Sequence, residues 1–166
     1  MSLRRTPRFN RRFLLILPLL ALGACGFQPV YGSGGTGAAL QNRVLVDTPD
    51  DRFGYFLVRE LETRLGRTNA PAYGLGLTIT TEEDGLAIDS TGTTTRYNIL
   101  GTAAFALRDL TTGQIVTSGK VESFTGYSAT GTTVATLAAE QDAQKRLMTI
   151  LADQIVTRLH ATDLTQ

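Results

Sequence analysis

The chain has 166 residues and a formal net charge of +1, and its length is typical of one domain that can bury a substantial core. Residues 1–24 hold five of the 16 basic residues and none of the 15 acidic ones, so the remainder carries a net charge of about −4. This balance excludes attraction to nucleic acid or anionic lipid by bulk charge, and the single cysteine excludes a disulfide within the chain.

The N-terminal residues form an export signal. Paired arginines at 11–12 precede an apolar run over 13–22, and the sequence Leu-Gly-Ala-Cys follows at 22–25. A positive segment, an apolar segment and small residues at the cleavage point make up a secretory signal peptide. An aliphatic residue and two small residues before a cysteine form a lipobox, which predicts cleavage between Ala24 and Cys25 and lipidation of the Cys25 thiol. We therefore interpret 1–24 as a lipoprotein signal peptide.

A short membrane span or a buried free cysteine would be the alternatives to a lipobox. The apolar run has about 10 residues, whereas a transmembrane helix needs roughly 20. The paired arginines could direct export of the folded protein, but they lack the usual flanking residues. We therefore expect export of the unfolded chain.

The residues after Cys25 predict a flexible tether over 25–42. Its glycine-rich part, GSGGTGAALQ at 32–41, would reach roughly 17 Å as a random coil. A phosphate-binding loop is the alternative, but such a loop continues with Gly-Lys-Ser/Thr, and here Ala38-Ala39-Leu40 follow.

The short β-branched run 43–47 predicts a first strand, and a helix follows from Thr48 to Gly66. Thr48 is a suitable helix cap, Pro49 suits the first turn, and Gly66 suits the end. The apolar residues repeat at helical spacing: Phe53, Phe56, Leu57, Leu61 and Leu65. The pair Asp50-Asp51 could form a metal or acid/base site, but capping and the helix dipole account for it better.

Three strands in an antiparallel meander are predicted next. Alternation of apolar and polar residues over 73–80, from about 93 to 107 and from 115 to about 127 indicates strands with one buried face. An acidic cluster, Glu82-Glu83-Asp84, is expected in an irregular hairpin tip over 81–94. It lacks the ligand spacing of a calcium loop, so a solvated tip is expected. Gly101 is expected to allow a bend or bulge.

Residues 133–160 predict one long amphipathic helix. Its inner, mostly apolar stripe, in which Gln144 is a polar gap, comprises Val134, Leu137, Ala138, Gln141, Leu147, Met148, Leu151, Ile155 and Leu159. A helix lying on a membrane surface is the alternative, but the outer face has mixed charge and no aromatic residue. We therefore expect this helix to pack on the sheet.

These elements together predict an α+β domain over 43–162. An amphipathic helix and a half-buried sheet each need a partner for the apolar face. The fold expected is a two-layer sandwich in which two helices pack on one face of a four-stranded, mostly antiparallel sheet, in the order β-α-β-β-β-α. The place of the first strand in the sheet stays open.

No set of residues predicts catalysis, a cofactor or a metal site. His160 is the only histidine, and it falls at the end of the last helix. A Ser-His-Asp triad needs an imidazole held on both nitrogens, and a zinc site needs several His or Cys ligands. The sequence therefore favours a binding or scaffolding protein over an enzyme.

Three segments resemble the LptE family of lipopolysaccharide-assembly lipoproteins. They are Cys-Gly-Phe-Gln-Pro-Val-Tyr at 25–31, Ala-Glu-x-Asp-Ala at 139–143 and Ile-x-x-Arg-Leu at 155–159, together with the predicted order of strands and helices. The resemblance implies a non-catalytic lipoprotein, anchored through Cys25 on the periplasmic side of the outer membrane. It also implies that the protein sits as a plug in an LptD-type β-barrel and helps this barrel to assemble. The pair would insert lipopolysaccharide into the outer leaflet. Gly26 is not a signal for retention at the inner membrane.

The resemblance also implies basic residues that contact lipopolysaccharide phosphates near the tip of the hairpin. The predicted tip, 81–94, contains no Lys or Arg, so we transfer no contact there. Arg96 and Lys120 are expected on solvent-facing positions of adjacent strands, where a guanidinium and an ammonium could together bind phosphate. The alternative is that they are surface charges paired with Glu122 or Asp89.

Two other functions remain open. The chain could be an accessory subunit of a different envelope assembly or transport complex, which the co-purifying partner would reveal. It could also be a small hydrolase or carbohydrate-binding domain, which would need a pocket with convergent polar groups.

Overall fold

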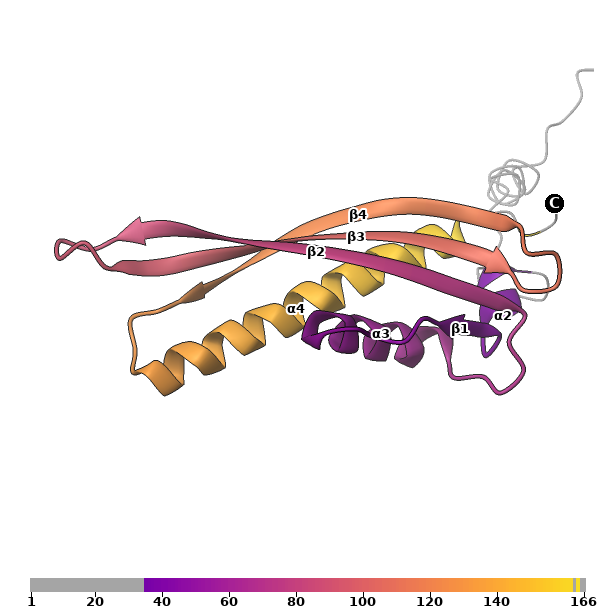
Figure 1. Ribbon diagram of the computed structural model, residues 1–166, viewed down its shortest axis with the longest axis horizontal. Coiled ribbons are helices and arrows are strands. Elements are labelled where there is room, and N and C mark those ends of the chain that lie inside the picture. The colour runs from indigo at the N-terminus through magenta and orange to yellow at the C-terminus, as the bar shows by residue number, and fades with distance from the viewer. Residues whose placement is uncertain (1–34, 163, 165–166) are drawn as a thin grey trace, which may run out of the picture.

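The computed structural model describes residues 35–162 and 164. Three helices and a four-stranded sheet make up the described chain (Figure 1). In chain order the elements are α2 (Thr36–Leu40), β1 (Val44–Val46), α3 (Arg52–Leu65), β2 (Tyr73–Ile88), β3 (Thr94–Asp109), β4 (Ile115–Ser128) and α4 (Thr133–His160). The predicted α+β class and the order of the main elements are confirmed.

The strands follow one another in space as β1-β2-β3-β4. β1 runs parallel to β2, with Val44 opposite Tyr73, and the other two pairs are antiparallel. A parallel pair needs a crossover connection, and α3 provides it. The first strand therefore lies at the edge of the sheet, next to β2, which settles the question that the sequence left open.

Both long helices lie on the same face of the sheet (Figure 1). The core between the two layers is almost entirely aliphatic, and its fully buried large side chains are Leu40, Leu57, Leu61, Leu65, Leu75, Leu107, Leu147, Met148, Leu151, Ile155, Leu159 and Val121. Burial of a leucine contributes about 1.5–3 kcal/mol, so this layer supplies the main driving force for folding.

The predicted tether is wrong for its last part. Thr36–Leu40 is helical, Leu40 is fully buried, and the Thr36 hydroxyl donates to the Thr162 carbonyl at 3.0 Å. Leu40 is the apolar residue that makes packing possible in an otherwise small and polar segment. The earlier part of the tether, the signal peptide and Cys25 lie outside the described residues.

Helix α3 begins later than predicted. Its cap is Asp51, whose carboxylate accepts a hydrogen bond from the Gly54 N–H at 2.6 Å, and Thr48 lies before the helix. Aspartate is as good a cap as threonine, and the chain uses the residue nearer the apolar stripe. The capping role expected for the Asp50-Asp51 pair is therefore confirmed for Asp51.

The hairpin between β2 and β3 is longer than predicted. The acidic cluster Glu82-Glu83-Asp84 lies within β2, and the turn is confined to 89–93. The Asp89 carboxylate accepts hydrogen bonds from the N–H groups of Thr91 and Thr93 at 2.8 and 3.0 Å. Asp89, rather than the acidic cluster, thus organises the chain reversal. Hydrogen bonds lower the pKa of Asp89, and the largest effect comes from the Thr91 hydroxyl.

Helix α4 packs on the sheet along only part of its length. Val134 and Leu137 are 78% and 50% exposed, whereas Leu147, Leu151 and neighbouring core residues are buried. Its N-terminal end diverges from the sheet in Figure 1. The expectation that the whole stripe faces the sheet is therefore wrong for the first turns.

Candidate interaction surface

The sheet has one face covered by helices and one open face. Along β3 the odd-numbered residues Ile99, Ala103, Phe105 and Leu107 are buried beneath the helices. The even-numbered side chains of β3, and those opposite them on β4, therefore lie on the open face. Arg96 and Lys120 both belong to this open face, as the sequence predicted.

The structure does not bring Arg96 and Lys120 together. Arg96 lies opposite Ser128, whereas Lys120 lies opposite Ala104, eight residues farther along β3. At about 3.4 Å per residue the two backbone positions are roughly 27 Å apart. The Lys120 ammonium instead pairs with the Glu122 carboxylate at 2.5 Å and lowers its pKa by that hydrogen bond and its charge.

Arg96 lies instead among exposed apolar side chains. A shallow cleft of about 430 Å³ is lined by Arg96 and Asn98 together with Leu86 and Phe124. Phe124 lies opposite Leu100 across the β3–β4 pair, and the two are 65% and 40% exposed. We call Leu86, Arg96, Leu100 and Phe124 the distal patch.

Sequence reasoning missed the apolar part of the distal patch, although a signal was available. Leu100 and Phe124 are large apolar residues at positions that the alternation assigns to the open face. A contiguous exposed apolar group beside a cation is typical of a surface that binds a partner or an amphiphile.

On the helix-covered face, beyond the packed part of α4, two tyrosines stack. The rings of Tyr97 and Tyr127 lie 5.2 Å apart at an interplanar angle of 12°. Partial burial raises the pKa of Tyr127 to about 12, and the negative charge and hydrogen bond of Glu83 add to the effect. Tyr127 therefore stays neutral and ties β4 to β2 across β3.

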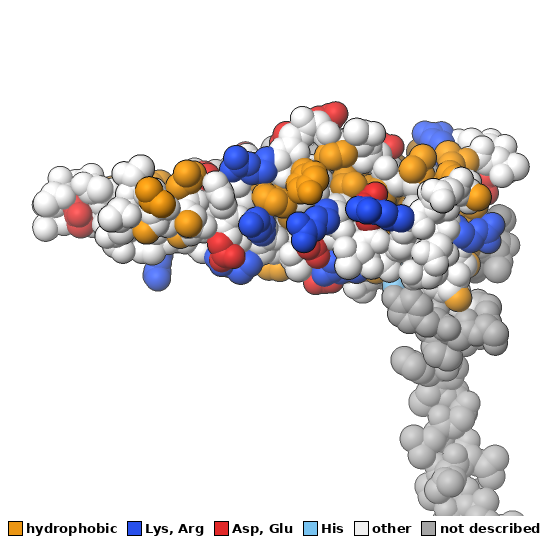
Figure 2. Space-filling view, turned by 90° about the horizontal axis from the view of Figure 1, so that it is seen from below, with side chains coloured by type: hydrophobic (Ala, Val, Ile, Leu, Met, Phe, Trp, Pro, Cys, Tyr) orange, Lys and Arg blue, Asp and Glu red, His pale blue; other side chains and the backbone are white. Residues whose placement is uncertain are grey.

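Figure 2 shows the molecule from the helix side. Along the middle of this face, side chains of both charges are interspersed with hydrophobic side chains, and a further hydrophobic group lies toward the end at the left. A mixed surface of this kind does not form a single-sign field that would steer a charged ligand.

The structure also places the single histidine that the sequence singled out. His160, at the end of α4, is half-buried, and this burial lowers its pKa. Within 35–162 and at 164, no three His, Cys, Asp or Glu side chains are grouped to hold a metal ion. None of the described helices has the length and apolar character to cross a membrane.

Comparison with known families decides the assignment. The sequence profile of LptE, described as lipopolysaccharide-assembly, matches residues 40–159, which is most of the chain. The chain belongs to the LptE family. The match spans the described domain from the end of α2 to the end of α4. No curated protein sequence matches the chain.

Solved structures share the fold of this chain. A protein from Caulobacter crescentus described as a lipoprotein has a TM-score of 0.64 and 21% identity, with 76% of this chain and 93% of that one covered. Rare lipoprotein B from Shewanella oneidensis gives a TM-score of 0.55 at 18% identity, covering 73% of this chain and 94% of that one. A minor lipoprotein from Acinetobacter baumannii has a TM-score of 0.54 at 17% identity, with 74% of this chain and 91% of that one covered.

Proposed function

We propose that this LptE-family protein is a non-catalytic outer-membrane lipoprotein, lipid-anchored on the periplasmic side, that plugs and helps assemble an LptD-type β-barrel. In this role it takes part in inserting lipopolysaccharide into the outer leaflet. The observation that carries the proposal is the family match over residues 40–159. The lipobox ending at Cys25 supports the anchor.

The anchor needs more than one acyl chain on Cys25. Each buried CH₂ contributes about 0.8 kcal/mol, and a single chain gives only reversible attachment. Changing Cys25 to Ala removes the acceptor thiol. The variant is expected in the periplasmic fraction, whereas the wild type sediments with outer membrane; a variant that still sediments there would contradict the anchor.

The barrel partner is tested by co-purification after detergent extraction of outer membrane. A β-barrel protein of several hundred residues is expected to elute with the chain in stoichiometric amount. Elution with the components of another assembly or transport machine, and no barrel, would instead support an accessory role in that complex.

Lipopolysaccharide contact is proposed at the distal patch. The Arg96 guanidinium can pair bidentately with a phosphate, and the apolar side chains of Leu86, Leu100 and Phe124 can meet acyl chains. The proposed phosphate site contains Arg96 without Lys120. The register separates the two residues, and Lys120 is paired with Glu122.

Replacement of Arg96 by Ala tests this site. Loss of one charge-assisted contact is expected to weaken lipopolysaccharide binding by about tenfold, measured by displacement of a fluorescent analogue. Lys120→Ala is the matched control, because it removes a cation from the same face. Equal binding by the Arg96→Ala variant and the wild type would exclude Arg96 from the site.

A further inference from the structure

Strand β1 pairs with the outer edge of β2 only at the start of β2. β1 pairs with β2 along Val44–Val46, opposite Tyr73–Leu75, whereas β2 continues to Ile88. Past this pairing, the Asp47 N–H donates to the Leu75 carbonyl at 3.0 Å. The strand then runs on without a neighbour on this side in the part of the chain that the structure describes.

The open edge presents a regular row of backbone groups. Peptide groups turn alternately to the two sides of a strand, so every second residue after Leu75 directs its N–H and carbonyl to the edge that β1 leaves free. These residues are Leu77, Ile79, Thr81 and Glu83. Among residues 35–162, no hydrogen bond reaches their backbone groups from outside the sheet. Such a row is a template for an added strand.

Carboxylates flank this open edge at both of its ends. Asp47, Asp50 and Asp51 line a cleft of about 280 Å³ that also includes Leu77 and Ile79. The cluster Glu82-Glu83-Asp84 lies at the far end, within β2. No ion pair engages any of these six carboxylates in the described chain. Asp51 accepts the capping hydrogen bond of α3, and Glu83 hydrogen-bonds Tyr127.

The opposite edge of the sheet is different. On β4 the Lys120–Glu122 pair balances charge, and the Arg146 guanidinium donates to the Gly126 carbonyl at 3.2 Å. One edge is therefore electrically balanced and partly capped by α4. The other is acidic, and within residues 35–162 its outward-facing backbone groups from Leu77 to Glu83 have no hydrogen-bond partner.

We propose that the free edge of β2, over residues 77–83, binds an extended basic segment of a partner polypeptide as a fifth strand. Backbone hydrogen bonds to the four outward-facing residues hold the segment, and lysine or arginine side chains meet the two acidic groups. A second copy of this chain is disfavoured as the occupant, because the same carboxylates would face each other. The proposal goes beyond the lipopolysaccharide role and does not depend on the distal patch.

The test uses the full-length protein in detergent and two synthetic peptides. One is a decapeptide of alternating lysine and threonine with a fluorescent label. The other has the same sequence but is N-methylated at every second residue, which keeps its charge and blocks strand pairing. Binding is measured by fluorescence anisotropy, and amide hydrogen exchange locates the peptide.

Two protein variants complete the design. Thr81→Pro removes an outward-facing donor from the β2 edge without removing a hydrogen bond to β3. Glu122→Pro makes the same change on the β4 edge and is the matched control. The Gly126 carbonyl faces that edge, and backbone groups alternate along a strand, so the N–H of Glu122, four residues earlier, faces the same edge. Circular dichroism establishes that both variants are folded.

The unmodified peptide is expected to bind the wild type and Glu122→Pro equally and to slow exchange at residues 77–83. N-methylation, or Thr81→Pro, is expected to weaken binding at least about tenfold. If the N-methylated and unmodified peptides bind equally, charge attraction alone accounts for binding and the proposal is overturned. Protection of β4 amides, or no binding of the unmodified peptide to the wild type, would also overturn it. If Thr81→Pro is unfolded, the peptide pair and the exchange pattern decide alone.

Discussion

Gly101 sets how closely helix α4 approaches the sheet. A Cβ atom there would lie 2.9 Å from Leu147 Cδ2 and 3.2 Å from Leu151 Cδ1. No bulge lies at Gly101, since the register shifts of β3 and its partners lie near Gly85 and Leu107. The glycine provides space for the helix.

Gly101→Ala is expected to destabilise the protein by about 1–3 kcal/mol, because an added methyl group in a packed core forces its neighbours apart. Gly76→Ala is the control, since a Cβ there would lie at an ordinary 3.4 Å from Asp47 Oδ2. Urea denaturation gives both free energies of unfolding. Equal values for the two variants would contradict close packing at Gly101.

Gln144 is the single polar side chain in the described core. Its Nε2 donates to Glu140 Oε1 at 2.8 Å, while its own carbonyl oxygen is buried without a hydrogen-bond partner. A buried polar atom without a partner costs about 1–3 kcal/mol. The gap that the sequence shows in the apolar stripe of α4 is thus a buried amide with one unsatisfied acceptor.

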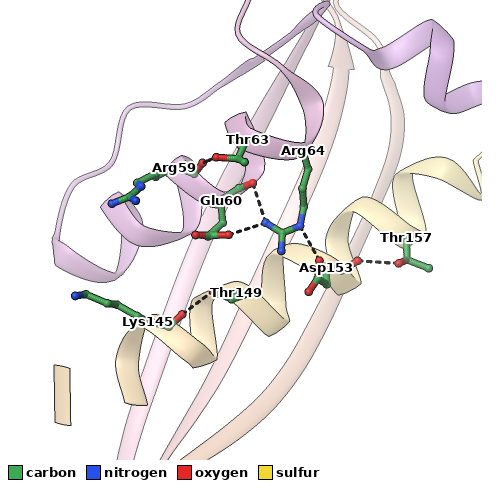
Figure 3. A network of polar contacts seen from close by, with 8 residues as sticks. All are labelled: Arg59, Glu60, Thr63, Arg64, Lys145, Thr149, Asp153 and Thr157. Carbon is green, nitrogen blue, oxygen red and sulfur yellow. Dashed lines mark hydrogen bonds and ion pairs between the residues drawn. The ribbon is translucent and has the colours of Figure 1, made fainter. Parts of the chain in front are cut away.

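At the scale of elements, α3 and α4 are joined by a polar contact as well as by the buried apolar side chains that they share in the core. Figure 3 shows the Arg64 guanidinium between the helices, where Nε donates to Asp153 Oδ1 at 2.6 Å and Nη1 to Glu60 Oε2 at 2.7 Å. Lys145 lies over the Phe56 ring at 5.6 Å and links the same two helices.

A double-mutant cycle of Arg64→Ala and Asp153→Ala is expected to give a coupling energy of about 0.2–1 kcal/mol, since the Asp153 side chain is largely exposed. The coupling should fall as salt screens the charges. Thermal denaturation at low and high salt measures it. A coupling that does not change with salt would show that the contact acts through packing.

The long elements could be predicted from the sequence because periodicity is strong in α3, α4 and the three long strands. The short helix α2 could not, since four small residues and one leucine carry no period. Burial of Gly37 and Leu40 and the hydrogen bond from Thr36 to Thr162 order it. The site was predicted less well. Alternation gives the face on which Arg96 and Lys120 lie, but only the register gives their separation along the strands.

At the scale of the whole molecule, packing is uneven along the long axis. The end that holds α2, β1 and α3 has helices against the sheet, whereas the hairpin of β2 and β3 extends past them (Figure 1). Residues 82–93 are all exposed, as are most of the first residues of α4. Stability is therefore concentrated at the α2 end.

Amide hydrogen exchange is expected to follow this gradient. Opening free energies should be lowest for 82–94 and for the first two turns of α4, and highest for the segments around Leu107 and Leu151. Exchange measured residue by residue on the full chain tests the expectation. Uniform protection from one end to the other would mean that the hairpin and the core unfold as one unit.

The position of α2 also determines how far the molecule can extend from a membrane. Cys25 lies ten residues before Gly35, so even a fully extended connection spans no more than about 35 Å. The tip at 89–93 lies at the opposite end from α2, separated from it by the length of β2, about 54 Å for 16 residues. A lipid on Cys25 would thus keep the α2 end close to the membrane and set an upper limit to the distance between the anchor and the tip.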